Sequence, residues 1–233
     1  MLAQRQEIEM CFSPQGDVAA GIVVTAIGID ACRHIDGRKE YWLIAPLPLL
    51  LGLHQIDEAF VWWGLQGHVP HGLATVAMWI YLAVALVVLP VLIPLLVIRV
   101  EPPGRRRQLM VAFLGLGGFV SGVLLLTMLQ GSPSAQLGSY HIAYSIGLRH
   151  GTLVIGLYIV ATCGPLLASG MKRVVWFGVA NLAAVVVLAK LSADGFTSLW
   201  CLYAALVSAA IALHLRTTST GGGTRSSVVV RTS

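Results

Sequence analysis

Charged side chains are scarce in this sequence. They make up 11% of the 233 residues, against about a quarter in soluble globular domains, while 57% of the residues are hydrophobic. The mean hydropathy is +0.82. The composition therefore excludes an ordinary soluble domain and predicts a protein that crosses a membrane several times.

Three further absences narrow the class of protein. The four cysteines form no CxxC pair and no zinc-ligand spacing. Residues 1–17 carry Arg5 against Glu7, Glu9 and Asp17, so the basic segment of a cleaved signal peptide is missing. Long basic stretches are also missing, because the net charge of +5 is divided among short clusters between apolar runs. We therefore exclude nucleic acid as a partner.

Seven apolar runs predict an all-α bundle of seven transmembrane helices. Most approach the roughly 20 residues that a helix needs to cross the hydrocarbon core. The first run is short and holds Asp30, and the third contains Pro90 and Pro94, each of which breaks one turn of backbone hydrogen bonding. This membrane domain covers 18–215, and the polar, Gly-rich tail at 216–233 is expected to be disordered. The runs lie at 18–32, 42–64, 72–98, 108–129, 150–169, 174–191 and 196–215.

Basic residues gather in alternate loops, which sets the expected orientation. Twelve of the 15 lysines and arginines lie between runs one and two, three and four, or five and six, or in the tail. The exceptions are Arg5, Arg149 and Lys190. Because Lys- and Arg-rich loops stay in the cytoplasm, we predict a multi-pass protein of the cell membrane. Residues 1–17 would lie outside and the C-terminus inside, with the lipid bilayer as the partner; protein partners stay open.

Polar residues interrupt the second apolar run, LGLHQIDEAFVWWGL at 51–65. His54, Asp57 and Glu58 are spaced i, i+3 and i+4, so they share one face of a helix. Gln55 is offset from His54 by about 100°. A polar side chain in hydrocarbon costs free energy unless it has a partner. Two interpretations stay open: a functional site, or interhelical hydrogen bonds that hold the bundle together.

The predicted orientation places further polar residues on the same outer side as Glu58. Carboxylates and imidazoles together suit proton transfer or metal binding. The candidate catalytic residues are therefore Glu58, His141 and Asp57. The candidate binding residues, which come from the second run and the other outer segments, are His54, Gln55, Tyr144, Arg149, His150, Trp200, Cys11 and Cys201.

Two questions of chemistry stay open. The spacing of His54, Asp57 and Glu58 differs from HExxH, so zinc is a weakly indicated cofactor and no metal ligand is assigned. Cys11 and Cys201 have an alternative role as a disulfide, because both would face an oxidising compartment.

Five blocks of sequence carry a resemblance to a known family. The blocks are MCFS (10–13), HQIDEAFVWWGL (54–65), YHIAYS (140–145), LYIVATCGPLLAS (157–169) and LWCLYAALVSAAIALHL (199–215). In order and spacing they resemble a bacterial family of uncharacterised multi-pass membrane proteins, whose members typically begin Met-Cys-Phe-Ser. The resemblance covers about residues 10–215. The first nine residues have no counterpart, which makes Met10 an alternative start.

The resemblance implies a fold and a set of positions, because the family has no assigned activity. The family usually has Gln where His54 stands and Gly where Ala59 stands, and often Trp where Leu89 stands. Because of the first of these departures, we favour Glu58 over His54 as a functional residue. The positions that the family pattern singles out are Cys11, Phe12, Ser13, Gln55, Glu58, His141, Ile142, Tyr144, Tyr158, Thr162, Pro165, Trp200, Cys201, Ser208 and His214.

Three classes of function fit these residues. The first is a membrane-embedded enzyme that acts at the outer face on a lipid-like substrate. It resembles in outline the seven-helix ceramidase-like hydrolases, but it lacks their paired C-terminal histidines. The second is a small proton-coupled transporter that uses Glu58. The third is a non-catalytic accessory protein in which the polar residues are structural contacts.

Overall fold

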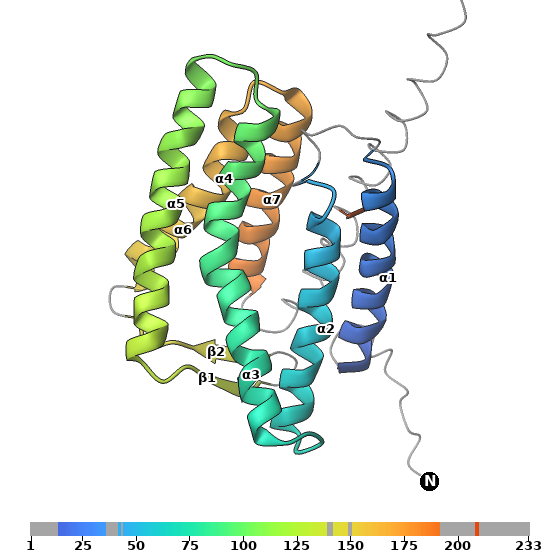
Figure 1. The fold of residues 1–233 in the computed structure, drawn as a ribbon. Coiled ribbons are helices and arrows are strands. Elements are labelled where there is room, and N and C mark those ends of the chain that lie inside the picture. The colour runs from blue at the N-terminus through green and yellow to red at the C-terminus, as the bar shows by residue number, and fades with distance from the viewer. Residues whose placement is uncertain are drawn as a thin grey trace, which may run out of the picture.

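The computed structural model describes residues 14–35, 42, 44–138, 142–148, 151–191 and 208–209, and most of these residues are helical. A π-helical segment, Ala83–Val88, joins α3 to α4 without a break. The helices stand side by side and alternate in direction (Figure 1). They are α1 (Pro14–Arg33), α2 (Leu47–Leu65), α3 (His71–Leu82), α4 (Leu89–Val100), α5 (Arg105–Gln130), α6 (Gly151–Ala168) and α7 (Lys172–Leu191).

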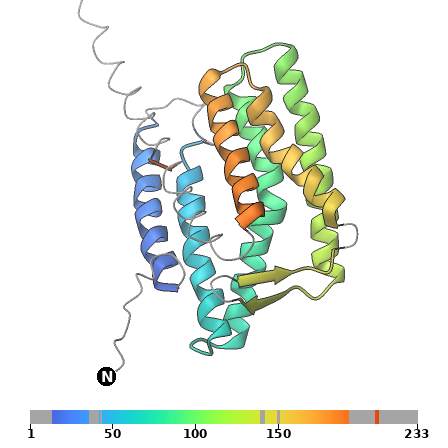
Figure 2. The same ribbon diagram turned by 180° about the vertical axis from the view of Figure 1, so that it is seen from behind.

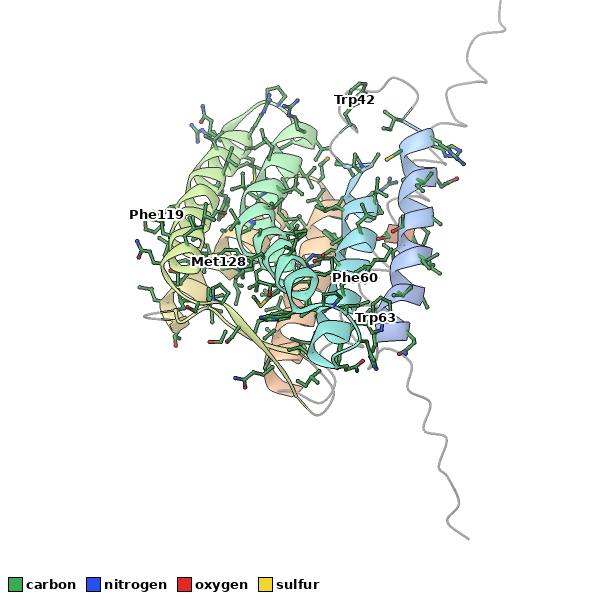
Figure 3. All side chains as sticks on the ribbon, turned by 60° about the horizontal axis from the view of Figure 1, so that its bottom comes forward. Trp42, Phe60, Trp63, Phe119 and Met128 are labelled. Atoms are coloured by element: carbon green, nitrogen blue, oxygen red, sulfur yellow. The ribbon has the colours of Figure 1, made fainter. Side chains whose placement is uncertain are left out.

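Four of the described helices are long and apolar enough to cross a membrane. They are α1, the continuous helix His71–Val100, α5 and α6. Their outer faces leave large apolar side chains uncovered. Phe119 on α5 is 63% exposed and points away from the neighbouring helices (Figure 3). Apolar surface of this kind on a helical bundle fits contact with lipid. The helical fold class expected from the sequence is thus confirmed, and the four long apolar helices are compatible with the expected membrane protein.

The helices differ from the apolar runs at their ends. Helix α1 begins at Pro14, four residues before the predicted run, and this brings Asp17 into its first turn rather than into the segment before it. Helix α2 begins at Leu47 rather than at residue 42, because Pro46 and Pro48 suit a first turn and not a helix interior. The seventh run, apart from Ser208 and Ala209, lies outside the described residues.

A β-hairpin follows α5 where the sequence predicted only a loop. Strand β1 (Ser134–Leu137) pairs antiparallel with β2 (Ile142–Ser145), with Ala135 opposite Tyr144. The hairpin runs from the end of α5 across the end of the bundle toward α2 (Figure 2). Ile142 anchors it in a buried cluster with Trp62 and Met128. The hairpin thereby reaches the same end of the bundle as the polar face of α2.

Helices α1 and α2 pack backbone to backbone. A Cβ atom added to Gly21 would lie 2.8 Å from the carbonyl oxygen of Gly52, and one added to Gly52 would clash with Thr25. Small residues at a helix contact allow this close approach and are common where helices meet in membranes. Because the helices are antiparallel, the contact at Gly21 places Asp17, one turn earlier on α1, level with Glu58 on α2.

Pro90 explains the π-helical segment. The N–H of Leu89 bonds to the carbonyl oxygen of Val84, five residues earlier, as a π-helix requires. The next bond of this pattern would join residue 90 to the carbonyl of Ala85, but proline has no N–H. The Tyr158 hydroxyl from α6 donates to that carbonyl instead, at 2.7 Å. The backbone irregularity in the long helix is therefore satisfied by a neighbouring helix.

Two further contacts hold the same helix against α5. The Ser121 hydroxyl donates to the carbonyl of Val87 at 2.7 Å. Gly117 lies directly against the carbonyl oxygen of Pro90, where an added Cβ atom would overlap it. That carbonyl has no helical donor, because residue 94 is also a proline.

The opposite end of the bundle is tied together by Glu101, which follows α4. Its carboxylate accepts hydrogen bonds from the Ser169 hydroxyl at 2.6 Å and from the backbone N–H of Gly170 at 2.8 Å. These bonds join the α4–α5 turn to the α6–α7 turn. Seven described basic residues lie at the same end: Arg33, Arg99, Arg105, Arg106, Arg107, Lys172 and Arg173. Lys190, near the far end of α7, is the exception within the described helices.

Candidate functional site

Glu58 lies on the buried side of α2, level with the hairpin end of the bundle. Its side chain is 7% exposed. The Tyr144 hydroxyl, from strand β2, donates to its carboxylate at 3.5 Å. The sequence singled out both residues independently, and the structure brings them together.

Tyr81 of α3 completes the contact. Its ring stacks on the imidazole of His54, with centroids 4.2 Å apart and planes 9° apart. Its other face stacks on Tyr144, at 4.7 Å and 17°. The hydroxyl of Tyr81 also hydrogen bonds to Glu58. Three rings from α2, α3 and the hairpin thus form a continuous stack, with the carboxylate held beside it.

The charges around Glu58 are negative. Within the described residues, the charged groups that act on its carboxylate are Asp17 and Asp57. Asp17 is fully buried and Asp57 is half-buried. Neighbouring carboxylates in a medium of low dielectric constant repel one another, and this repulsion favours a proton or a cation on one of them.

Tyr144 remains a hydrogen-bond donor over a wide pH range. Burial raises the pKa of its hydroxyl above the ordinary value, and the nearby Glu58 carboxylate raises this pKa further. A raised pKa means that the neutral hydroxyl persists to higher pH than in an exposed tyrosine. The proton between Tyr144 and Glu58 thus stays on the tyrosine whenever the carboxylate is ionised.

Several buried polar atoms beside Glu58 have no hydrogen-bond partner within the described part of the chain. They are Nδ1 of His54, both amide atoms of Gln55 and Nε1 of Trp62. Gln55, Glu58 and Trp62 are spaced i, i+3 and i+7, so they line one stripe of α2. A buried polar group without a partner costs about 1–3 kcal/mol, so groups of this kind normally meet a ligand, water or another part of the protein.

The predicted residues divide into two sets. His54, Gln55, Asp57, Glu58 and Tyr144 lie together at the hairpin end of α2, although no observation tests their roles. Cys11, His141, Arg149, His150, Trp200 and Cys201 lie outside the described residues. The proposed meeting of Glu58 with His141 and the Cys11–Cys201 disulfide therefore remain predictions.

Sequence reasoning missed Asp17 and Tyr81. The hydropathy pattern places Asp17 in the segment before the first span, because such a pattern does not register the polar first turn of a helix. Tyr81 sits in a uniformly apolar run. The pairing of α2 with α3 could have indicated Tyr81. Residues at equal distances from the turn between two antiparallel helices face each other, so residues near 81 lie opposite those near 55.

The metal prediction depends on residues that cannot be placed here. In 14–35, 44–138, 142–148 and 151–191, no three His, Cys, Asp or Glu side chains converge as metal ligands. His141 and His150, two further imidazoles that the sequence places on the same side as Glu58, lie outside these ranges, so the zinc alternative stays untested.

Comparison with known families gives one match. The sequence model of a family of unknown function, DUF6629, matches residues 10–226. The chain belongs to this family. The DUF6629 match spans all five sequence blocks and confirms the resemblance to an uncharacterised family. No curated protein and no solved structure matches the chain.

Proposed function

We propose that the chain is a seven-span membrane protein, with its N-terminus outside and its C-terminus in the cytoplasm, that couples proton binding at Glu58 to transport of a small solute. The lipid bilayer is its immediate partner and the cell membrane its location.

The distribution of charge supports this orientation. The seven basic residues at the Glu101 end fit a cytoplasmic face, because positive loops are retained inside. The Glu58 cluster, at the opposite end, would then open toward the outside. Asp17 and Glu58 would both lie within the outer half of the bundle.

One observation carries the proton-coupled function: Glu58 is buried against two tyrosine hydroxyls, and the charges acting on it from the described residues are other carboxylates. A membrane-embedded acid of this kind is costly in its ionised form, and this cost favours a group that binds a proton. Within the described residues, no serine, threonine or cysteine side chain hydrogen bonds to Glu58 or His54. The alternative of a hydrolase thus depends on residues such as His141, whereas proton exchange does not.

Reconstituted protein tests this function. Liposomes that contain a pH-sensitive dye and the full chain should change their internal pH when the transported solute, sought by adding small solutes one at a time, is supplied on one side, with voltage clamped by potassium and valinomycin. Glu58→Gln should remove the protein-dependent flux. Glu101→Gln, which alters a buried acid at the other end of the bundle, is the matched control and should keep it.

Two results would contradict the proposal. One is unchanged proton flux in a folded Glu58→Gln protein. The other is an absence of flux in the wild type combined with a Glu58→Gln protein that merely unfolds at lower temperature, which would favour an accessory protein with structural polar contacts.

A further inference from the structure

We propose that the α4–α5 turn and the α6–α7 turn together bind the headgroup of an anionic phospholipid. This surface goes beyond proton binding at Glu58 and does not depend on it. Its cations come from the first turns of α5 and α7, and they are Arg105, Arg106, Arg107 and Lys172.

Contacts between the two turns bring these basic side chains together. The guanidinium group of Arg106 donates to the carbonyl oxygen of Ser169 at 3.4 Å, and Ser169 stands three residues before Lys172. A Cβ atom added to Gly170 would lie 3.0 Å from the same guanidinium group. The two turns lie side by side at one end of the bundle (Figure 1). Basic residues that are far apart in the sequence therefore share one surface.

The four cations are exposed and are not neutralised by ion pairs. In the part of the chain that the structure describes, no carboxylate lies within ion-pair distance of any of them. Arg106 donates to a carbonyl oxygen instead, and Arg173, next to Lys172, already interacts with another group. Like charges on one surface repel one another, so an anionic partner is favoured.

The sequence has few acids that could neutralise this surface. Of the ten acidic residues in the chain, those between α1 and α2 or between α4 and α5 are Asp36, Glu40 and Glu101. The first two lie in DGRKEY at 36–41, among an equal number of basic residues. Glu101 is already held by two hydrogen bonds and offsets at most one of the four charges.

Exposed apolar side chains continue from the cations along both helices, and they identify the anion as a lipid. On α7, Lys172, Trp176 and Val179 are spaced i, i+4 and i+7, so they share one face. Trp176 is 72% exposed and Val179 is 43% exposed. On α5, Leu109 follows Arg105 by one turn and is 47% exposed. A cation followed by aromatic and aliphatic groups is the order in which a helix passes from lipid headgroups into acyl chains.

The cations also select the type of headgroup. Guanidinium groups donate paired N–H bonds to phosphate oxygens, which suits the three arginines of α5 to a phosphodiester. Phosphatidylcholine carries the same phosphate together with a choline cation, which this surface repels. A lipid with net negative charge, such as phosphatidylglycerol, is therefore preferred.

Quenching of Trp176 by brominated lipids measures which lipid occupies this surface. The full chain is placed in nanodiscs of phosphatidylglycerol and phosphatidylcholine, with bromine on the acyl chains of one lipid or the other, close to the headgroup. The difference between wild type and Trp176→Phe isolates the signal of this residue. We expect a preference for phosphatidylglycerol of about ten-fold in relative binding constant, because several cations face one headgroup.

A triple variant locates the preference. Arg105→Gln/Arg107→Gln/Lys172→Gln removes three of the four cations and keeps the contact of Arg106 with Ser169. It should bring the preference for phosphatidylglycerol close to one, with thermal unfolding used to check that the protein is folded.

A second triple variant is the matched control. Arg33→Gln/Arg38→Gln/Lys39→Gln removes the same number of positive charges from the end of α1 and the segment that follows it. It should keep the preference. Because the two triple variants have the same net charge, an effect of total charge would change both alike.

Three results would overturn the proposal. Equal quenching by the two brominated lipids in the wild type would do so without any charge variant. Equal loss of the preference in both triple variants would assign it to the overall charge of the protein. Loss of the preference on addition of inorganic phosphate, but not of sodium chloride at the same ionic strength, would indicate a site for a soluble anion. None of these results bears on proton flux through Glu58, so the two proposals are tested separately.

Discussion

The Tyr144 hydroxyl donates to the Glu58 carboxylate at 3.5 Å and joins a surface hairpin to a helix that precedes it by 86 positions in the chain. This contact connects the β1–β2 hairpin to the buried acidic group of α2. Changes in the hairpin therefore have a direct route to the charge state of Glu58.

The ionisation of Tyr144 can be followed optically. Because its pKa is raised, its proton should be lost at higher pH than the proton of an exposed tyrosine, near 10. The unfolded chain loses the proton first, so the contribution of this residue to the free energy of unfolding falls as pH rises above about 10. The difference in tyrosinate absorbance between wild type and Tyr144→Phe measures this. A group that titrates near 10 in that difference would contradict the contact.

The bond between Tyr158 and Ala85 offers a double-mutant cycle. Tyr158→Phe leaves the carbonyl of Ala85 without a donor and should lower the free energy of unfolding by about 1 kcal/mol. Pro90→Ala supplies the missing N–H, so the same tyrosine change should cost less in that background. Thermal unfolding in detergent provides the four values. Equal losses of unfolding free energy in the two backgrounds would show that Pro90 is not the reason why the carbonyl of Ala85 lacks a helical donor.

Close packing of α1 on α2 predicts that Gly52→Ala is harmful. The added methyl group would clash with Thr25 and push α1 away, at a cost of about 1–3 kcal/mol. Gly118→Ala on α5 is the matched control, because nothing lies within 4 Å of its added Cβ atom. The control should be neutral or slightly stabilising. Comparable losses for the two changes, measured by thermal unfolding, would argue against the α1–α2 contact.

Gln55 is buried, and its carboxamide has no hydrogen-bond partner in the described residues. Gln55→Leu removes this unpartnered polar group and should raise the midpoint of thermal unfolding of the protein without added ligand. A fall in the unfolding midpoint without ligand would mean that another part of the protein hydrogen bonds to this side chain.

The helices were predictable from sequence because a membrane span depends on a long apolar stretch, which is a local property. Glu58 was predictable for the same reason, since an acid in such a stretch is expensive wherever it lies. The partners of Glu58 could not be predicted in this way, because tertiary contacts bring them to it. Tyr144 was indicated by its predicted side of the membrane and by the family resemblance, neither of which gave its contact with Glu58, and Tyr81 looked like any aromatic residue of an apolar run.

Other features escaped prediction for physical reasons that can be named. The hairpin strands are only four residues each, too short for an alternating pattern to emerge. The π-helical segment follows from Pro90, but the donor from Tyr158 that stabilises it lies 73 positions away. The packing of Gly21 on Gly52 required knowing which helices are neighbours.

The central claim is that Glu58 gains and loses a proton, and infrared difference spectroscopy between acidic and alkaline buffer tests it most directly. We expect the wild type to show the carbonyl stretch of a protonated carboxyl group that disappears at alkaline pH. This band should be absent from Glu58→Gln and present in Glu101→Gln. An identical difference spectrum for wild type and a folded Glu58→Gln protein would contradict the account.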